Sequence, residues 1–277
     1  MNIRLLGIIP LAIMVVMVMP GLAEESLPHG EVDWLNGTIK ATGVAHPHAK
    51  DSGNPVDPQK ILSVAKVSAQ QNLLKTIKQL QVSSTDRVDT LVGSNQLFMA
   101  KIQELIKKAP VIKQRYLSDS TLWITIEFRL WGAFSQLILP PGVKPIEAIT
   151  PIDPLVKKDK IKSDESEWTG LIVDAGDIDL KPALVPYILD DLGGHVYGPE
   201  FINRDFAVQW GMCGYTANMD TAQKIDRVGQ NPLTVKAIRT TGAEPTNIVI
   251  SATDAARIRA ASEYVVILRE GRVIVVD

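Results

Sequence analysis

The chain has 277 residues, of which 45% are hydrophobic and 22% are charged, as is usual for a globular protein. Its net charge of −2 at pH 7 argues against nucleic acid as a partner, because domains that bind nucleic acid are strongly basic. Only 5% of the residues are aromatic, which disfavours a large stacking surface for sugars.

Residues 1–23 have the pattern of a cleavable secretion signal. An apolar run from Leu5 to Met19 is followed by small residues at both positions that define a cleavage site, Gly21 and Ala23. The run is shorter than the roughly 20 residues that a membrane-spanning helix needs. A lipid-anchored protein would carry cysteine where this chain has Glu24. We therefore expect a periplasmic or secreted protein with no membrane span after signal cleavage.

The first region, residues 31–138, begins with a strand pattern and a helix pattern. Small or apolar residues alternate with polar ones from Leu35 to Gly43, which is the period of a half-buried strand. A loop rich in Gly and Pro follows at 46–58. Apolar residues then recur at steps of three and four from Leu62 to Leu80, which predicts a helix of about five turns.

A second helix and a hairpin complete the first region. The helix is predicted over 95–108, with Ser94 as its N-cap and Pro110 beyond its end. The hairpin pairs Val111–Tyr116 with Thr121–Leu130. The polar face of its second strand carries four residues: Trp123, Thr125, Glu127 and Arg129.

Residues 139–167 are predicted to be a semi-rigid linker, because they combine several prolines with a charged run.

The second region, 168–277, holds short strand patterns at 171–173, 186–189, 195–197, 232–238, 247–250, 265–268 and 273–276. Ser251, with Asp254 in the reciprocal capping position, is expected to begin a helix that ends near Ser262. We expect an α+β protein with two small domains, each a mostly antiparallel sheet with helices packed on it.

Small residues and a hairpin sequence give the first region a characteristic order: Gly37, Gly43, Ala65, Ala69 and Tyr116–Leu122. In this order, residues 31–131 resemble the bacterial twenty-kilodalton lipoprotein family and the related N-terminal domain of flagellar assembly protein T. The lipid-bearing cysteine is absent, and Ser120 stands at a hairpin position where glycine is expected. The resemblance implies a non-enzymatic envelope protein that contacts other proteins, in one branch around the flagellar basal body.

The second region is similar to an uncharacterised domain of exported bacterial proteins. The residues that carry this similarity are Thr169–Ala175 and Arg272–Asp277. No activity accompanies the similarity, so it adds no catalytic residue.

Motifs of known chemistry are absent from the sequence. It has no phosphate-binding loop, dinucleotide turn or nucleophile elbow, and we predict no catalytic residue and no cofactor. His46 and His48 are weak zinc candidates, because a zinc site needs three or four rigid ligands and exposed loop histidines explain them as well. Asp174, Asp177 and Asp179 are weak calcium candidates, since their spacing also suits a turn.

Other reactive or charged side chains have ordinary explanations. Cys213 is the single cysteine and has apolar neighbours, which indicates a buried thiol; an intermolecular disulfide or a reactive thiol is the alternative. His195 is expected to pack within a strand. Four arginines could meet an acidic partner or anionic lipid, but nearby glutamates favour solvated ion pairs: Arg257, Arg259, Arg269 and Arg272.

We expect an exported, non-enzymatic protein that binds envelope or outer-membrane proteins, or further copies of itself. Assembly or stabilisation of a surface or flagellar structure is one such role. Exposed strand edges would serve as the contact, with Trp123 as the candidate contact residue, although cover by a loop or by the linker would also explain that side chain. The alternative is a small-ligand binder or hydrolase with its site between the two domains.

Overall fold

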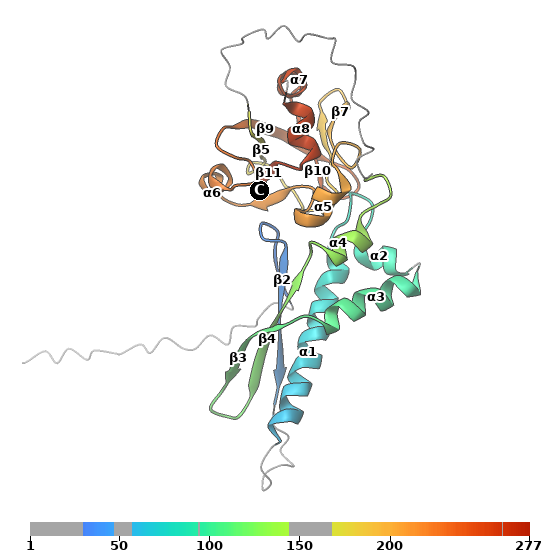
Figure 1. Cartoon of the computed structure of the whole chain (residues 1–277), viewed down its shortest axis with the longest axis vertical. Helices are drawn as coiled ribbons and strands as arrows, with labels where there is room; N and C mark the ends of the chain where they lie inside the picture. The colour runs from blue at the N-terminus through green and yellow to red at the C-terminus, as the bar shows by residue number, and fades with distance from the viewer. Residues whose placement is uncertain (1–29, 47–56, 94, 144–167, 262) are drawn as a thin grey trace, which may run out of the picture.

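The computed structural model describes residues 30–46, 57–93, 95–143, 168–261 and 263–277 (Figure 1). Residues 1–23, His48 and most of the expected linker lie outside these ranges. Within the described ranges, no helix combines the length and the apolar character needed to cross a membrane.

The first sheet has the order β1-β2-β4-β3 and is antiparallel throughout. Its strands are β1 (Glu31–Asp33), β2 (Thr38–Ala45), β3 (Val111–Tyr116) and β4 (Leu122–Arg129). Alternate residues of β2 and β4 are buried on one face, as the two-residue period predicts. The first long strand begins at Thr38 rather than Leu35, because Asn36 and Asp33 hydrogen-bond to each other in a turn before it.

Helix α1 (Pro58–Gln79) covers the buried face of the first sheet (Figure 1). The Asp57 carboxylate accepts the Gln59 N–H, and Pro58 occupies the first turn, where its missing N–H costs no helical bond. The helix lies close to the sheet at Gly43, where a Cβ would overlap the backbone of Ala65 and Ala69. The predicted helix is therefore confirmed, and its small residues permit the close packing.

Three shorter helices follow in the first region: α2 (Val88–Gly93), α3 (Gln96–Lys107) and α4 (Ala133–Ile138). The predicted second helix corresponds to α3. Its N-cap is Asn95, whose side chain accepts the N–H groups of Leu97 and Phe98, so the assignment of Ser94 was wrong by one residue.

The β3–β4 hairpin is confirmed. Its turn contains Ser120 at a φ of +67°, in the left-handed region that favours glycine. The Asp119 carboxylate accepts the Thr121 N–H at 2.9 Å within this turn. The hairpin thus keeps the backbone conformation for which glycine was expected, with serine in its place.

The second sheet has the order β7-β6-β10-β9-β5-β11-β8. Its strands are β5 (Gly170–Asp174), β6 (Ile188–Asp190), β7 (His195–Tyr197), β8 (Gly214–Thr216), β9 (Pro232–Thr241), β10 (Asn247–Ile250) and β11 (Val273–Val276). Four neighbouring pairs are parallel and two are antiparallel. The α+β class is confirmed, but the expectation of a mostly antiparallel sheet is wrong for this second sheet. Parallel pairs join segments far apart in the chain, and local periodicity does not reveal them.

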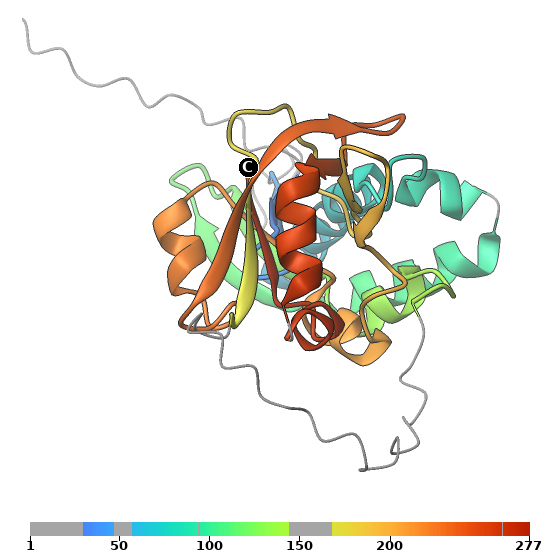
Figure 2. The same cartoon turned by 90° about the horizontal axis from the view of Figure 1, so that it is seen from above.

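The helices of the second region are α5 (Arg204–Trp210), α6 (Met219–Lys224), α7 (Ala252–Ala260) and α8 (Tyr264–Arg269). Ser251 caps α7 by accepting the Asp254 N–H at 3.0 Å, as predicted. The strand expected at 265–268 is wrong, because those residues lie in α8, the dark red helix seen nearly end-on in Figure 2, where α7 runs lengthwise over the sheet. A short apolar run has no period that separates a strand from a buried helix.

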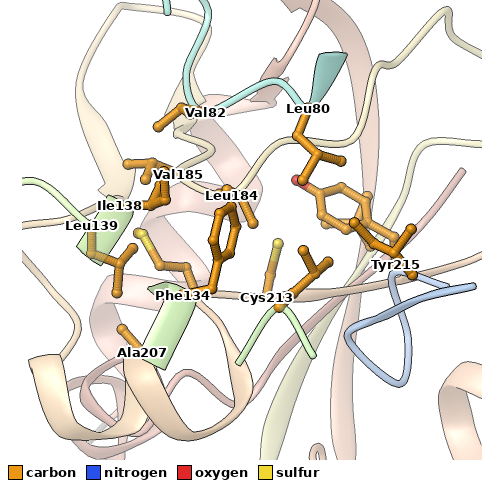
Figure 3. Close-up of a cluster of buried hydrophobic side chains, with 14 of the residues drawn as sticks. Leu80, Val82, Phe134, Ile138, Leu139, Leu184, Val185, Ala207, Cys213 and Tyr215 are labelled. Atoms are coloured by element: carbon orange, nitrogen blue, oxygen red, sulfur yellow. The ribbon is translucent and has the colours of Figure 1, made fainter. Parts of the chain in front are cut away.

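The two regions share one hydrophobic core (Figure 3). Labelled side chains from both regions meet there: Leu80, Val82, Phe134, Ile138, Leu139, Leu184, Val185, Ala207, Cys213 and Tyr215. Backbone hydrogen bonds also join them, including Leu184 N–H to Gln81 O at 3.0 Å and Val185 N–H to Val82 O at 2.7 Å. We refer below to the described residues of 30–143 and 168–277 as the first and second halves.

Candidate functional site

The first sheet has a second face that points away from α1, and we call it the open face. Paired residues on neighbouring strands share a face, so the register gives its composition. Its four cross-strand rows are Val44–Trp123–Arg115, Thr42–Thr125–Lys113, Glu31–Lys40–Glu127 and Asp33–Thr38–Arg129.

Trp123, the predicted contact residue, lies in the middle of the first row and is half-buried. The guanidinium of Arg115, on the neighbouring strand β3, lies 5.5 Å from the centre of the Trp123 ring. The sequence also allowed a loop or the linker to cover Trp123. At least part of that cover comes instead from Arg115 of β3. The two side chains form an aromatic and cationic surface beside the strand edge.

Charge on the open face is unevenly distributed. In the third row, Lys40 lies between the carboxylates of Glu31 and Glu127. In the fourth row, Asp33 and Arg129 bring opposite charges to the same row. Burial raises the pKa of Asp33, but hydrogen bonds from Asn36 and the charge of Lys40 outweigh burial and lower this pKa below its ordinary value, so Asp33 is ionised at neutral pH. The charges of these two rows therefore largely balance.

The two rows nearest the hairpin turn lack this balance. Lys113 is paired with Thr125, and Arg115 is paired with Trp123, so neither cation has a carboxylate directly opposite it. Both side chains are exposed. The unbalanced positive charge of the open face is therefore concentrated on β3.

Strand β3 forms one edge of the first sheet. It has six residues, whereas the other three edge strands of the two sheets, β1, β7 and β8, have three each. Every residue from Ile112 to Tyr116 is exposed, including two large apolar side chains, Ile112 at 48% and Tyr116 at 59%. Among the described strands, β3 is therefore the longest edge available to another chain.

The direction of the backbone groups follows from the hairpin. The Leu117 N–H donates to Thr121 O at 2.9 Å, so Leu117 turns its backbone groups toward β4. In an antiparallel ladder this direction alternates, which turns Lys113 and Arg115 inward and Gln114 and Tyr116 outward. The sequence identified β3 as a strand but missed this edge, since strand order was needed to find it.

The weak candidates for metal ligands do not come together among the described residues. His46 hydrogen-bonds Thr121 through Nδ1 at 3.1 Å, while His48 lies outside the described residues. Asp177 forms an ion pair with Lys236 at 2.6 Å, and Asp174 accepts the N–H of Gly176. In the part of the chain that the structure describes, no three His, Cys, Asp or Glu side chains gather to hold a metal ion, and Asp179 joins no such group.

Two other reactive side chains have clear surroundings. His195 lies in strand β7, as predicted, but its side chain is exposed rather than packed. Its Nδ1 pairs with Glu200 at 2.5 Å and its ring meets Tyr187 edge-on. Cys213 is buried, and burial raises its pKa to about 11, so its thiol stays protonated at neutral pH. The packing expected for His195 was therefore wrong, and the buried thiol expected at Cys213 is confirmed.

Three of the four arginines near the end of the chain form local ion pairs: Arg257 with Asp254, Arg259 with Asp190, and Arg272 with Glu270. The ion-pair interpretation is confirmed for these three side chains. Their charge is therefore not available as a free basic patch.

A pocket of about 600 Å³ lies at the junction of the halves, and we call it the junction pocket. Its apolar wall includes Phe98 and Pro140 from the first half and Val185 and Tyr187 from the second. On its polar side, Asp86 accepts hydrogen bonds from the hydroxyl groups of two other lining residues, Ser83 and Thr85. The volume is within the range of small-molecule sites.

These features define an α+β protein whose two halves share a core and whose first sheet has an exposed edge. Residues 170–277 match the family model of the second domain of Treponema pallidum Tp0624. The match covers β5 to β11 and less than half of the chain. No curated protein matches this sequence. The likeness of the first region to lipoproteins and flagellar assembly protein T stays a prediction.

Proposed function

We propose that this protein is an exported, non-enzymatic component of the bacterial cell envelope that binds another protein by strand addition at β3. The observation that carries the proposal is the exposed six-residue edge Val111–Tyr116. Export is supported by the secretion-signal pattern of residues 1–23. Assembly or stabilisation of a surface or flagellar structure is the process that the resemblance of the first region favours.

Strand addition follows from the chemistry of a sheet edge. The outward N–H and C=O groups of Gln114 and Tyr116 can bond to an extended segment of another protein, and such bonds supply affinity without any special side chain. Exposed Tyr116 and Ile112 add apolar surface beside those groups. Trp123 and Arg115 add a second contact on the open face.

The position of the hairpin suits this role. The β3–β4 turn points away from the second half, and β3 lies on the outer side of the first sheet (Figure 1). A strand added beside β3 would therefore extend the first sheet without displacing any described element.

The test is crosslinked capture of the protein from its native cell envelope, with the captured proteins identified by mass spectrometry. It compares wild type with Gln114→Pro and Gln114→Ala. Proline removes an outward N–H and is tolerated at an edge strand, whereas alanine removes only the side chain. We expect Gln114→Pro to lose the captured partner and Gln114→Ala to keep it. Equal capture by all three proteins would contradict strand addition at β3.

A second candidate function, binding of a small ligand, is favoured by the junction pocket. A panel of metabolites is screened for a rise in melting temperature, which a ligand specific to the folded protein produces. Thr85 lines the pocket and Thr90 does not, and both are exposed, so Thr85→Arg is matched by Thr90→Arg. A rise that Thr85→Arg abolishes and Thr90→Arg keeps would support the pocket. If no compound raises the melting temperature, the junction pocket is not a small-ligand site. The same result would argue against a hydrolase with its active site in that pocket.

A further inference from the structure

The chemistry of the added strand can be derived from the charges of β3. The third and fourth rows of the open face bring acids and bases together. Lys113 and Arg115, by contrast, have only Thr125 and Trp123 beside them on β4. On their other side no described strand is paired with β3, and an added strand would lie there.

We infer that the partner segment at β3 is an acidic strand, with carboxylates at two alternate positions opposite Lys113 and Arg115; this inference rests on the proposed function. Side chains of an added strand alternate between the two faces of the sheet, so residues two apart share the open face. Opposite charges directly across from each other stabilise a strand pair. The carboxylates would extend the first two rows, which become Val44–Trp123–Arg115–acid and Thr42–Thr125–Lys113–acid.

The other face of the added strand has different neighbours. Tyr116 and Gln114 share the face of Leu122 and Ile124, their partners on β4. That face is apolar in β4, and Tyr116 remains 59% exposed at the edge. An added strand with an apolar residue between or beside its carboxylates would bury part of the Tyr116 ring. The recognised pattern is therefore an alternation of acidic and apolar residues.

A second copy of this chain does not have that chemistry at β3. Antiparallel self-pairing centred on Gln114 would place Lys113 of each copy opposite Arg115 of the other. Parallel pairing in register would place Lys113 beside Lys113 and Arg115 beside Arg115. Like charges directly opposite each other destabilise a strand pair, and exposed lysine on an edge is a known protection against self-association. The charges thus disfavour self-pairing and favour an acidic partner.

The inference is tested with three short synthetic peptides and the full chain. One peptide alternates glutamate with valine or threonine, the second has lysine in place of glutamate, and the third has glutamine. Binding is measured by NMR through the amide shifts and the hydrogen exchange of Gln114 and Tyr116. We expect the glutamate peptide to bind at least about tenfold more tightly than the lysine peptide, with glutamine between them.

Charge reversal provides the matched variants. Lys113→Glu combined with Arg115→Glu should reverse the preference, so that the lysine peptide binds more tightly. Lys101→Glu combined with Lys107→Glu makes the same change of net charge on exposed positions of α3 and should leave the preference intact. The pair of double variants separates local recognition at β3 from the overall charge of the protein.

The outcomes separate the inference from the proposed function. Three results would overturn the inference of an acidic partner. They are equal binding of the glutamate and lysine peptides, a preference that persists after charge reversal at β3, and no binding of the glutamate peptide. In each of those cases, capture with Gln114→Pro decides strand addition independently. Loss of the captured partner in Gln114→Pro would leave strand addition standing with a partner of other chemistry, and unchanged capture would remove both.

Discussion

The indole of Trp131, in the first half, lies directly against the backbone of Gly211, in the second half. A Cβ added to Gly211 would overlap the six-membered ring of Trp131, and a Cβ added to Gly37 would overlap the same indole near its nitrogen. Both glycines have positive φ, +81° at Gly211 and +62° at Gly37. The indole is therefore held between glycines from the two halves, which fixes the second half against the first sheet.

Gly211→Ala should lower the free energy of unfolding by at least about 2 kcal/mol, because it combines a strained backbone with a steric overlap. The measurement is urea unfolding of the full chain. Gly176→Ala is the control, since Gly176 has ordinary φ and only one atom within 4 Å of an added Cβ. Equal stability of the two variants would show that Trp131 can move without cost and would contradict the packing described above.

Arg204 forms a second link between the halves. Its guanidinium donates to the carbonyl oxygens of Gln136, Leu139, Pro140 and Val143 at 3.1–3.3 Å, at the end of α4. Arg204→Ala should lower the free energy of unfolding by about 2–3 kcal/mol, as expected for lost hydrogen bonds to a charged group. Arg129→Ala, at an exposed position of β4, should change it by less than about 0.5 kcal/mol. A loss at Arg204 no larger than that control would mean that the link is weak.

The Cys213 thiol should not react with thiol reagents in the folded protein at neutral or mildly alkaline pH. It is buried and its pKa is raised to about 11, so both access and thiolate formation are lacking. Labelling should become complete when denaturant unfolds the chain. Rapid labelling of the folded protein would reveal an accessible thiol and overturn this description.

Asp190 should make stability depend on pH in the acid range. Its carboxylate accepts hydrogen bonds from Arg259 and the Gly194 N–H, which lower its pKa below the ordinary value. Because the folded pKa lies below the unfolded one, the contribution is present above about pH 4 and is lost as pH falls through the folded pKa. Urea unfolding over this range should therefore show a shallower acid slope for Asp190→Asn. Parallel slopes would show that Asp190 is not a source of the acid sensitivity.

Trp123→Ala should reduce capture of the envelope partner if, as we propose, the partner contacts Trp123 and Arg115, which pack against each other on the open face beside β3. Its neighbour in the next row gives the control, Thr125→Ala, which removes a smaller side chain from the same face. Capture is compared at equal amounts of folded protein. If Trp123→Ala retains the partner at the wild-type level, the open face is not part of the contact.

Local periodicity was sufficient to predict α1 and the β3–β4 hairpin, because each repeats its apolar pattern over several turns or residue pairs. The helix α8 was missed because Val265–Leu268 is too short to show a period. The order of the second sheet could not be predicted, since parallel pairs such as β5 with β11 join segments far apart in the chain.

The candidate site was predicted in part. The alternation of the second hairpin strand placed Trp123 on the polar face, which the register confirms. The unbalanced positive charge of Lys113 and Arg115 could not be predicted from the sequence. Recognising it required the pairing of β3 with β4 and the finding that no further described strand lies beside β3. The packing of Trp131 between Gly37 and Gly211 depends on contacts between distant segments. No local sequence pattern around these residues predicts such contacts.

Residue-resolved amide hydrogen exchange of β3, with and without the partner captured from the envelope, tests strand addition most directly. We expect slower exchange at Gln114 and Tyr116 when the partner is bound, and little change at Lys113 and Arg115, whose N–H groups face β4. Unchanged exchange at Gln114 and Tyr116, with slowing instead around Tyr187 and the junction pocket, would contradict binding at the β3 edge.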